Sequence, residues 1–230
     1  MKRYVGCAVI TIMVLLVIGC QGPEQMLLKK YFNAMQFQDK TTLGLMAVDP
    51  VTLNVSKWEI VSVGEETTKP AELKAKTQAE EDAKKQLEDL KAKGRETEGP
   101  MQEAEAMLKT ARGKSKTIVQ ADYDAKKATY DAAVQKVKDA QKVLNLAKAE
   151  TAEERKIEVL SVTEIPGIEE MEGEYRTKTV TVRLTLKKED RSDATPKDYI
   201  IELRSYKLTN PATGRPARGK WILVKMAPVA

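Results

Sequence analysis

The fold is decided by two alanine-rich stretches, AELKAKTQAEEDAKKQLEDLKAKGRETEGPMQEAEAMLKTAR at 71–112 and TIVQADYDAKKATYDAAVQKVKDAQKVLNLAKAETAEER at 117–155. Residues 71–155 contain 17 alanines, 18 basic and 17 acidic residues, so this segment is dense in charge but nearly neutral. Such a composition is typical of long solvated helices. Gly113 interrupts the pattern near its midpoint. We therefore expect a hairpin of two antiparallel helices, each about 60 Å long at 1.5 Å per residue.

Apolar residues repeat at imperfect heptad spacing in both helices, which indicates coiled-coil packing. The repeat positions include Leu73, Ala83, Leu87, Leu90, Ala104, Leu108, Val137, Ala140 and Leu144. Lys76 and Glu80 also fall at core positions, which weakens a two-helix seam and favours contact with a further helix. Gly99 and Pro100 predict a kink or short loop within the first helix, because proline cannot donate a backbone hydrogen bond. A three-helix arrangement remains the alternative.

The segments that flank the hairpin have the pattern of a packed domain. Apolar spacing predicts helix within 23–47, with a break at 36–40. Alternating or apolar runs predict strands at 58–63, 157–162, 179–186, 199–208 and 220–226. Helices followed by an antiparallel meander define an α+β domain. Neither flank alone buries a sheet face, so we expect one discontinuous domain, 20–70 with 156–230, that carries 71–155 as an insertion.

The composition of the chain excludes several kinds of chemistry. Its 230 residues include no histidine and two cysteines, with a net charge of +5. The absence of histidine excludes Ser-His and Cys-His catalysis and histidine-metal sites. The sequence has no phosphate-binding glycine loop, no metal-ligand spacing and no nucleophile elbow. We therefore expect no catalytic residues, no metal and no cofactor, and a protein that is not an enzyme.

The N-terminal segment resembles the signal peptide of a bacterial lipoprotein. Two basic residues precede a 14-residue apolar stretch at 5–18, which is short for a membrane-spanning helix. The sequence Val17-Ile18-Gly19-Cys20 then resembles a lipobox. The resemblance implies a signal peptide at 1–19, cleavage between Gly19 and Cys20, and a diacylglycerol thioether on Cys20. An N-terminal anchor that is never cleaved is the alternative.

Lipidation would place the protein on a membrane of the cell envelope. Acyl chains on Cys20 would hold the protein to one leaflet, because each buried CH₂ contributes about 0.8 kcal/mol. By resemblance to known sorting signals, Gln21 favours the periplasmic face of the outer membrane in a Gram-negative organism. Residues 183–230 carry a local net charge of +6. We interpret this charge as a solvated sheet face rather than a site for anionic lipid, and we expect no nucleic-acid partner.

The predicted domain resembles the NTF2-like (cystatin-related) domains of small bacterial lipoproteins. The resemblance rests on YFNAMQFQD at 31–39, WEIVSV at 58–63 and GKWILVK at 219–225. It implies an α+β fold in which a helix packs on a curved antiparallel sheet and lines a cone-shaped pocket. The long hairpin departs from the core of that family. Five residues are the candidates for lining such a pocket: Tyr31, Asp39, Trp58, Tyr206 and Trp221.

These observations favour a lipid-anchored, non-enzymatic envelope protein that binds or scaffolds through the hairpin, the cone or both. Its expected partners are the membrane, through acylated Cys20, and a protein or a second copy, through the hairpin. Two alternatives stay open. One is a periplasmic adaptor subunit of an export system, in which a helical hairpin also interrupts a β-rich domain. The other is a small-ligand binder or an enzyme that uses the pocket.

Overall fold

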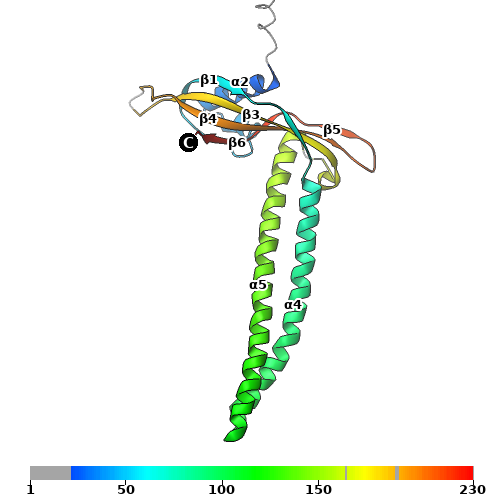
Figure 1. The fold of residues 1–230 in the computed structure, drawn as a ribbon. Helices are drawn as coiled ribbons and strands as arrows, with labels where there is room; N and C mark the ends of the chain where they lie inside the picture. The colour runs from blue at the N-terminus through cyan, green and yellow to red at the C-terminus, as the bar shows by residue number, and fades with distance from the viewer. Residues whose placement is uncertain (1–21, 164, 190–191, 230) are drawn as a thin grey trace, which may run out of the picture.

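The computed structural model describes residues 22–163, 165–189 and 192–229. These residues form a mixed α+β structure in which a long helical hairpin projects from an antiparallel sheet (Figure 1). The predicted α+β class and the predicted hairpin are therefore confirmed. The predicted signal peptide at 1–19 and the predicted lipidation site at Cys20 lie outside the described residues.

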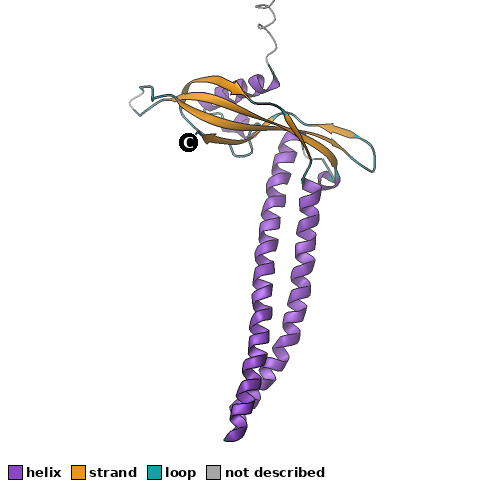
Figure 2. Ribbon diagram, viewed as in Figure 1, coloured by secondary structure: helices purple, strands orange, loops and turns teal. Residues whose placement is uncertain are grey.

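Two long neighbouring strands, β3 and β4, form the centre of the sheet (Figure 2). Strands β1 and β2 pair with successive stretches of β3, and strands β5 and β6 pair with β4, always antiparallel. The strands are β1 (Val55–Val63), β2 (Thr67–Pro70), β3 (Glu172–Leu186), β4 (Lys197–Thr209), β5 (Pro216–Arg218) and β6 (Ile222–Pro228). The strands predicted at 58–63, 179–186, 199–208 and 220–226 correspond to β1, β3, β4 and β6. The short strands β2 and β5 were not predicted, because four and three residues are too few to show an alternating pattern of apolar and polar side chains.

Two helices, α2 (Pro23–Gln36) and α3 (Lys40–Gly44), cover one face of the sheet. The chain breaks between them, as the sequence predicts. Asp39 caps α3, because its carboxylate accepts a hydrogen bond from the Thr42 backbone N–H at 3.0 Å. The buried core beneath the helices includes Leu28, Tyr31, Phe32, Met35, Val180, Val182, Leu184, Ile201 and Leu203.

The hairpin consists of α4 (Leu73–Thr110) and α5 (Lys114–Val162), and it connects β2 to the segment before β3. At 1.5 Å per residue, α4 is about 57 Å long. Residues at the predicted repeat positions form the seam between the helices: Ala83, Leu87, Leu90, Val137, Ala140 and Leu144. Gly113 makes the turn with a φ of 61°, a conformation that favours glycine.

The loop predicted as one alternative at Pro100 is wrong, because α4 continues through this residue, whereas the predicted kink stays a prediction. Proline removes one N–H donor, and here the affected turn is exposed, so water can solvate the carbonyl that loses its partner. Thr97 also donates a hydrogen bond from its hydroxyl to the Gly94 carbonyl oxygen at 2.8 Å. Beyond the proline, Ala104 is fully buried, so helix packing resumes on the far side of the exposed turn.

The predicted strand at 157–162 is also wrong, because these residues form the last turns of α5. They are buried at i, i+1, i+4 and i+5, which is helical spacing: Ile157, Glu158, Ser161 and Val162. The hairpin helix therefore extends past residue 155, where we expected the hairpin to end. We call the sheet together with α2 and α3 the body. The last turns of α5 pack into the core of the body, although they also form the end of the hairpin.

The base of the hairpin packs on the opposite face of the sheet from α2. Tyr175 and Val180 are both buried, and they are separated by an odd number of positions along β3, so their side chains point to opposite faces. A second core beneath the hairpin includes Leu73, Ile157, Val162, Ile168, Tyr206 and Leu208. Figure 1 shows the result, with α2 on one side of the sheet and the hairpin on the other.

These boundaries predict which deletion of the hairpin the fold tolerates. Replacing residues 81–146 by a short glycine-rich turn keeps Leu73, Glu154 and Ile157, and we expect a cooperative thermal transition within a few degrees of that of the full chain. Deleting 71–155 removes a buried leucine and a buried carboxylate, and we expect a loss of at least about 3 kcal/mol. Circular dichroism during heating distinguishes the two. Unfolding of the shorter deletion would contradict the assignment of the core.

Candidate functional site

Two of the predicted pocket residues, Tyr31 and Trp58, pack in the core beneath α2. The Tyr31 side chain is fully buried, and its hydroxyl accepts a hydrogen bond from the Val51 backbone N–H at 3.2 Å. Burial raises the pKa of Tyr31. The Trp58 ring stacks on Phe32 with 4.9 Å between ring centroids. Both aromatic residues therefore fill the space between the helix and the sheet.

The other three predicted pocket residues lie elsewhere. Asp39 is exposed, and hydrogen bonds from the side chain and backbone of Thr42 lower its pKa. Trp221 lies at the edge of the α2 core, with the Arg176 guanidinium 5.3 Å from its ring centroid. Tyr206 lies on the opposite face of the sheet, beneath the hairpin. The structure does not bring the five residues together in one cavity.

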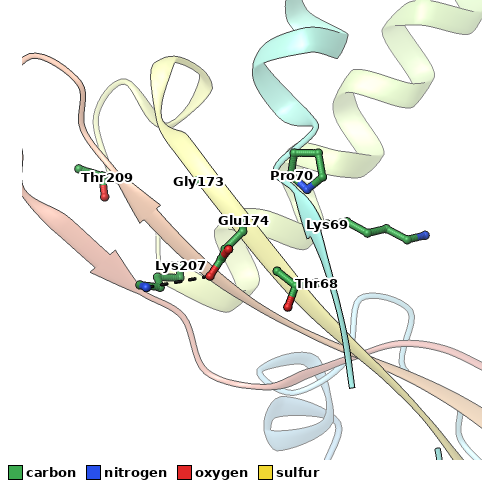
Figure 3. Close-up of a pocket in the computed structure, with 7 residues that line it drawn as sticks. All are labelled: Thr68, Lys69, Pro70, Gly173, Glu174, Lys207 and Thr209. Atoms are coloured by element: carbon green, nitrogen blue, oxygen red, sulfur yellow. Dashed lines mark ion pairs between the residues drawn. The ribbon is translucent and has the colours of Figure 1, made fainter. Parts of the chain in front are cut away.

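A groove crosses the sheet where β2, β3 and β4 lie side by side (Figure 3). Its volume is about 590 Å³, and its lining consists of Thr68, Lys69, Pro70, Gly173, Glu174, Lys207 and Thr209. Lys207 and Glu174 form an ion pair across it at 4.0 Å. The groove is lined by two lysines and one glutamate, and its side chains include no nucleophile paired with a base.

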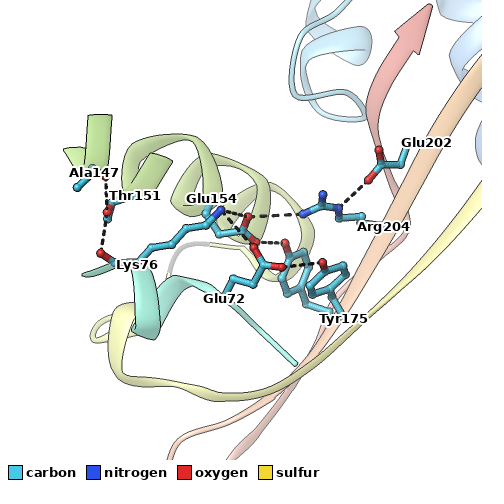
Figure 4. Close-up of polar contacts among 9 residues, drawn as sticks. Glu72, Lys76, Ala147, Thr151, Glu154, Tyr175, Glu202 and Arg204 are labelled. Atoms are coloured by element: carbon cyan, nitrogen blue, oxygen red, sulfur yellow. Dashed lines mark hydrogen bonds and ion pairs between the residues drawn. The ribbon is translucent and has the colours of Figure 1, made fainter. Parts of the chain in front are cut away.

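The most connected group of polar side chains lies where the hairpin meets the sheet, and we call it the base network: Glu72, Lys76, Glu154, Tyr175, Arg204 and Tyr206 (Figure 4). The Glu154 side chain on α5 is 2% exposed. It accepts a hydrogen bond from the Tyr206 hydroxyl at 2.5 Å and one from the Lys76 ammonium at 3.2 Å. The Arg204 guanidinium lies 3.5 Å from the same carboxylate. Side chains from α4 and β4 therefore converge on one buried carboxylate of α5.

A second carboxylate extends the base network to β3. Glu72 pairs with Lys76 at 3.3 Å and accepts a hydrogen bond from the Tyr175 hydroxyl at 3.0 Å. Burial and this hydrogen bond raise the pKa of Tyr175 to about 12. The Arg204 guanidinium lies over the Tyr175 ring, 4.7 Å from its centroid. Two carboxylates thus face two cations, so the interior carries little net charge.

One further carboxyl group, on Glu158, lies one helical turn beyond Glu154. It is fully buried, and neither of its oxygens has a hydrogen-bond partner among the described residues. Burial, with a smaller effect from the neighbouring Glu154 charge, raises the pKa of Glu158 to about 8. Glu158 is therefore protonated at neutral pH, which keeps a third negative charge out of the site.

The base network joins the two hairpin helices to β3 and β4. Removing one partner from a buried ion pair leaves an uncompensated charge and destabilises a protein by about 3–5 kcal/mol. The contacts therefore favour one orientation of the hairpin on the sheet. One signal of this site is present in the sequence, namely Lys76 at a core position of the heptad repeat. It could not identify the partner, because Glu154 belongs to a run of charged residues that looks solvated.

No group of three or more acidic, histidine or cysteine side chains in the described part of the chain could hold a metal ion. None of the helices within 22–163, 165–189 and 192–229 is long and apolar enough to cross a membrane. In comparisons with known proteins, no family model, curated protein or solved structure matches the chain.

The hydrogen bond between Tyr206 and Glu154 predicts the effect of a single substitution. Tyr206→Phe removes the hydroxyl and leaves the ring, and we expect a loss of about 1.5–3 kcal/mol, because the acceptor is charged. Tyr199→Phe is the matched control, because the Tyr199 hydroxyl forms no hydrogen bond with any described residue. Chemical denaturation measures both. Equal stability of the two variants would contradict a structural role for the base network.

The protonated Glu158 carboxyl predicts a pH dependence of stability. The pKa of Glu158 is raised on folding, so the folded protein binds more protons than the unfolded chain between about pH 4.5 and pH 8. Its contribution to stability is therefore present below about pH 4.5 and is lost as the pH rises to about 8. In Glu158→Gln, which mimics the protonated group, we expect this loss to shrink by more than about 1 kcal/mol. Denaturation curves at pH 5 and pH 8 measure it, and identical pH dependence in the variant would refute the assignment.

Proposed function

We propose that the chain is a lipid-anchored protein of the bacterial cell envelope whose non-enzymatic role is to hold the hairpin away from the membrane. In this proposal, Cys20 carries the lipid. The first described residue, Gly22, is two positions later, and two extended residues span at most about 7 Å. The start of α2 would therefore lie close to the bilayer.

The observation that carries the proposal is the placement of α2 and the hairpin on opposite faces of the sheet. The first turn of α2 is joined to the sheet by an ion pair between Glu24 and Lys178, at 3.3 Å. A lipid at residue 20 would therefore face one side of the body, while the base network directs the hairpin to the other side. With α4 about 57 Å long, the hairpin would reach far from the anchoring membrane.

We propose that the helices of the hairpin contact a protein partner or a second copy of the chain. A groove of about 590 Å³ lies between α4 and α5 beyond the buried seam. Its lining is rich in small residues, which would allow a partner helix to approach closely: Leu90, Lys93, Thr97, Ala128, Thr129, Ala132, Ala133 and Lys136. The thin seam, whose central cluster consists of four buried apolar side chains, two of them alanines, supports this proposal.

We further propose that the body is related to NTF2-like domains. The packing of α2 and α3 against an antiparallel sheet supports this relationship, as does the stacking of Trp58 on Phe32 beneath the helix. In this proposal the space under the helix is a filled core, and the contacts of the protein are made by the hairpin.

The anchor and the direction of the hairpin can be tested together. We expect labelling with a radioactive fatty acid to mark the wild-type protein and to be lost in Cys20→Ser. The lipidated protein is then placed in zwitterionic vesicles that contain an acceptor dye in the headgroups. A donor dye at Met26, which is exposed on α2, should transfer energy strongly, whereas a donor at Lys114 should transfer little.

Two results would overturn the proposal. Equal fatty-acid labelling of the wild type and Cys20→Ser would exclude the anchor. Equal energy transfer from residues 26 and 114 would show that the hairpin lies along the membrane instead of projecting from it. A donor at Lys84, in the first half of α4, is the intermediate control, and its transfer should fall between the two.

A further inference from the structure

The charge of the hairpin is distributed unevenly along its length. We define the hairpin tip as residues 106–121 and the shaft as residues 71–105 with 122–155. The tip contains four basic residues and no acidic residue, whereas the shaft contains 14 basic and 17 acidic residues. The tip therefore has a net charge of +4 at the end of a shaft with a net charge of −3.

The basic residues of the tip are exposed and mostly unpaired: Lys109, Arg112, Lys114 and Lys116. Lys109 pairs with Glu105 at 2.8 Å. Within the described residues, the other three form no ion pair. On the shaft, by contrast, lysines commonly pair with acids one turn away, as Lys126 does with Asp122 at 2.8 Å.

Helix stability does not explain the positions of Lys114 and Lys116. They lie in the first turn of α5, where the helix dipole carries its positive end and favours acidic side chains. No acidic residue occupies that turn, and no side chain caps it. The helix N-terminus and both lysines therefore add to the same positive potential, which suits an external anion.

Two large apolar side chains accompany this charge. Met107 on α4 is 59% exposed and Ile118 on α5 is 74% exposed. Basic side chains beside exposed apolar ones are typical of surfaces that bind the interface of an anionic bilayer. The tip is a convex end made of two helix termini and a turn, which suits a flat surface better than it would enclose a flexible polymer.

We propose that the hairpin tip binds the surface of an anionic lipid bilayer, with Arg112, Lys114 and Lys116 on the headgroups and Met107 and Ile118 at the interface. This binding does not depend on Cys20. If the proposed lipid anchor holds the other end of the molecule, a single chain would link two membrane surfaces, with the hairpin setting their separation.

The test uses residues 21–230, which contain every described residue and lack Cys20. Binding is measured by co-sedimentation with vesicles of phosphatidylcholine alone or with added phosphatidylglycerol. We expect binding to the anionic vesicles that weakens as salt is added. The triple variant Arg112→Gln, Lys114→Gln, Lys116→Gln should bind about a hundredfold more weakly, at about fivefold per basic residue.

A matched control removes the same charge from the shaft, through Lys84→Gln, Lys93→Gln and Lys138→Gln. These lysines are exposed and form no ion pair with a described residue, and we expect their loss to change binding by less than about fivefold, because they lie far from the surface. We expect Ile118→Ser to bind more weakly than the wild type, and we expect this difference in binding to persist at high salt. Circular dichroism confirms that each variant is folded.

Two outcomes would overturn the proposal. Equal loss of vesicle binding in the tip and shaft variants would show that net charge, and not the tip, governs binding. Binding of a soluble polyanion such as polyphosphate through the tip, without binding to anionic vesicles, would identify a polymer and not a bilayer as the partner. Neither outcome bears on whether Cys20 is acylated, so the lipid anchor is tested separately by the fatty-acid labelling.

Discussion

The contacts of the Glu154 carboxylate are the interaction on which the rest of the structure depends. A carboxylate that is 2% exposed requires compensation, and here it comes from Lys76 on α4, Arg204 on β4 and the Tyr206 hydroxyl. Because one partner lies on α4 and the other two lie on β4, the compensation is complete only when both helices sit correctly on the sheet. The apolar core beneath the hairpin supplies most of the burial, whereas the base network selects one orientation.

That orientation gives the molecule two ends with different chemistry. On one side of the sheet, α2 begins three residues after the proposed lipid site. On the other side, the hairpin ends in a basic tip with exposed Met107 and Ile118. Between them, the shaft carries 14 basic and 17 acidic residues, so most of its charges offset one another. A structure of this kind suits a protein that separates or connects surfaces.

The hairpin and most of the sheet were predictable, because their periodicity is strong. The heptad repeat located Ala83, Leu87 and Leu144 in the seam, and the alternation from residue 179 located the core face of β3. The end of α5 was not predictable, because a short apolar run such as 157–162 suits a strand or a buried helix equally well. Its helical state depends on packing against Tyr206, which lies far away in the sequence.

The base network could not be predicted from the sequence for a related reason. Glu154 belongs to a run of charged residues, and Glu158 belongs to the short apolar run at 157–162. Neither pattern predicts that the two carboxyl groups are buried against the sheet. The tip was visible in the sequence as a basic segment, but its significance required the structure. Only the turn at Gly113 places Lys114 and Lys116 in the first turn of a helix, at the end of the hairpin.

The central claim is that the base network holds the hairpin in one direction relative to the sheet, and pulsed electron-spin distance measurements test it most directly. Residues 21–230 contain no cysteine, so introduced cysteines at Thr179 on β3 and Lys138 on α5 would be the only spin-label sites. We predict one narrow distance distribution, which broadens when Glu154→Ala is added. A broad distribution with Glu154 intact, or an unchanged narrow one without it, would contradict the claim.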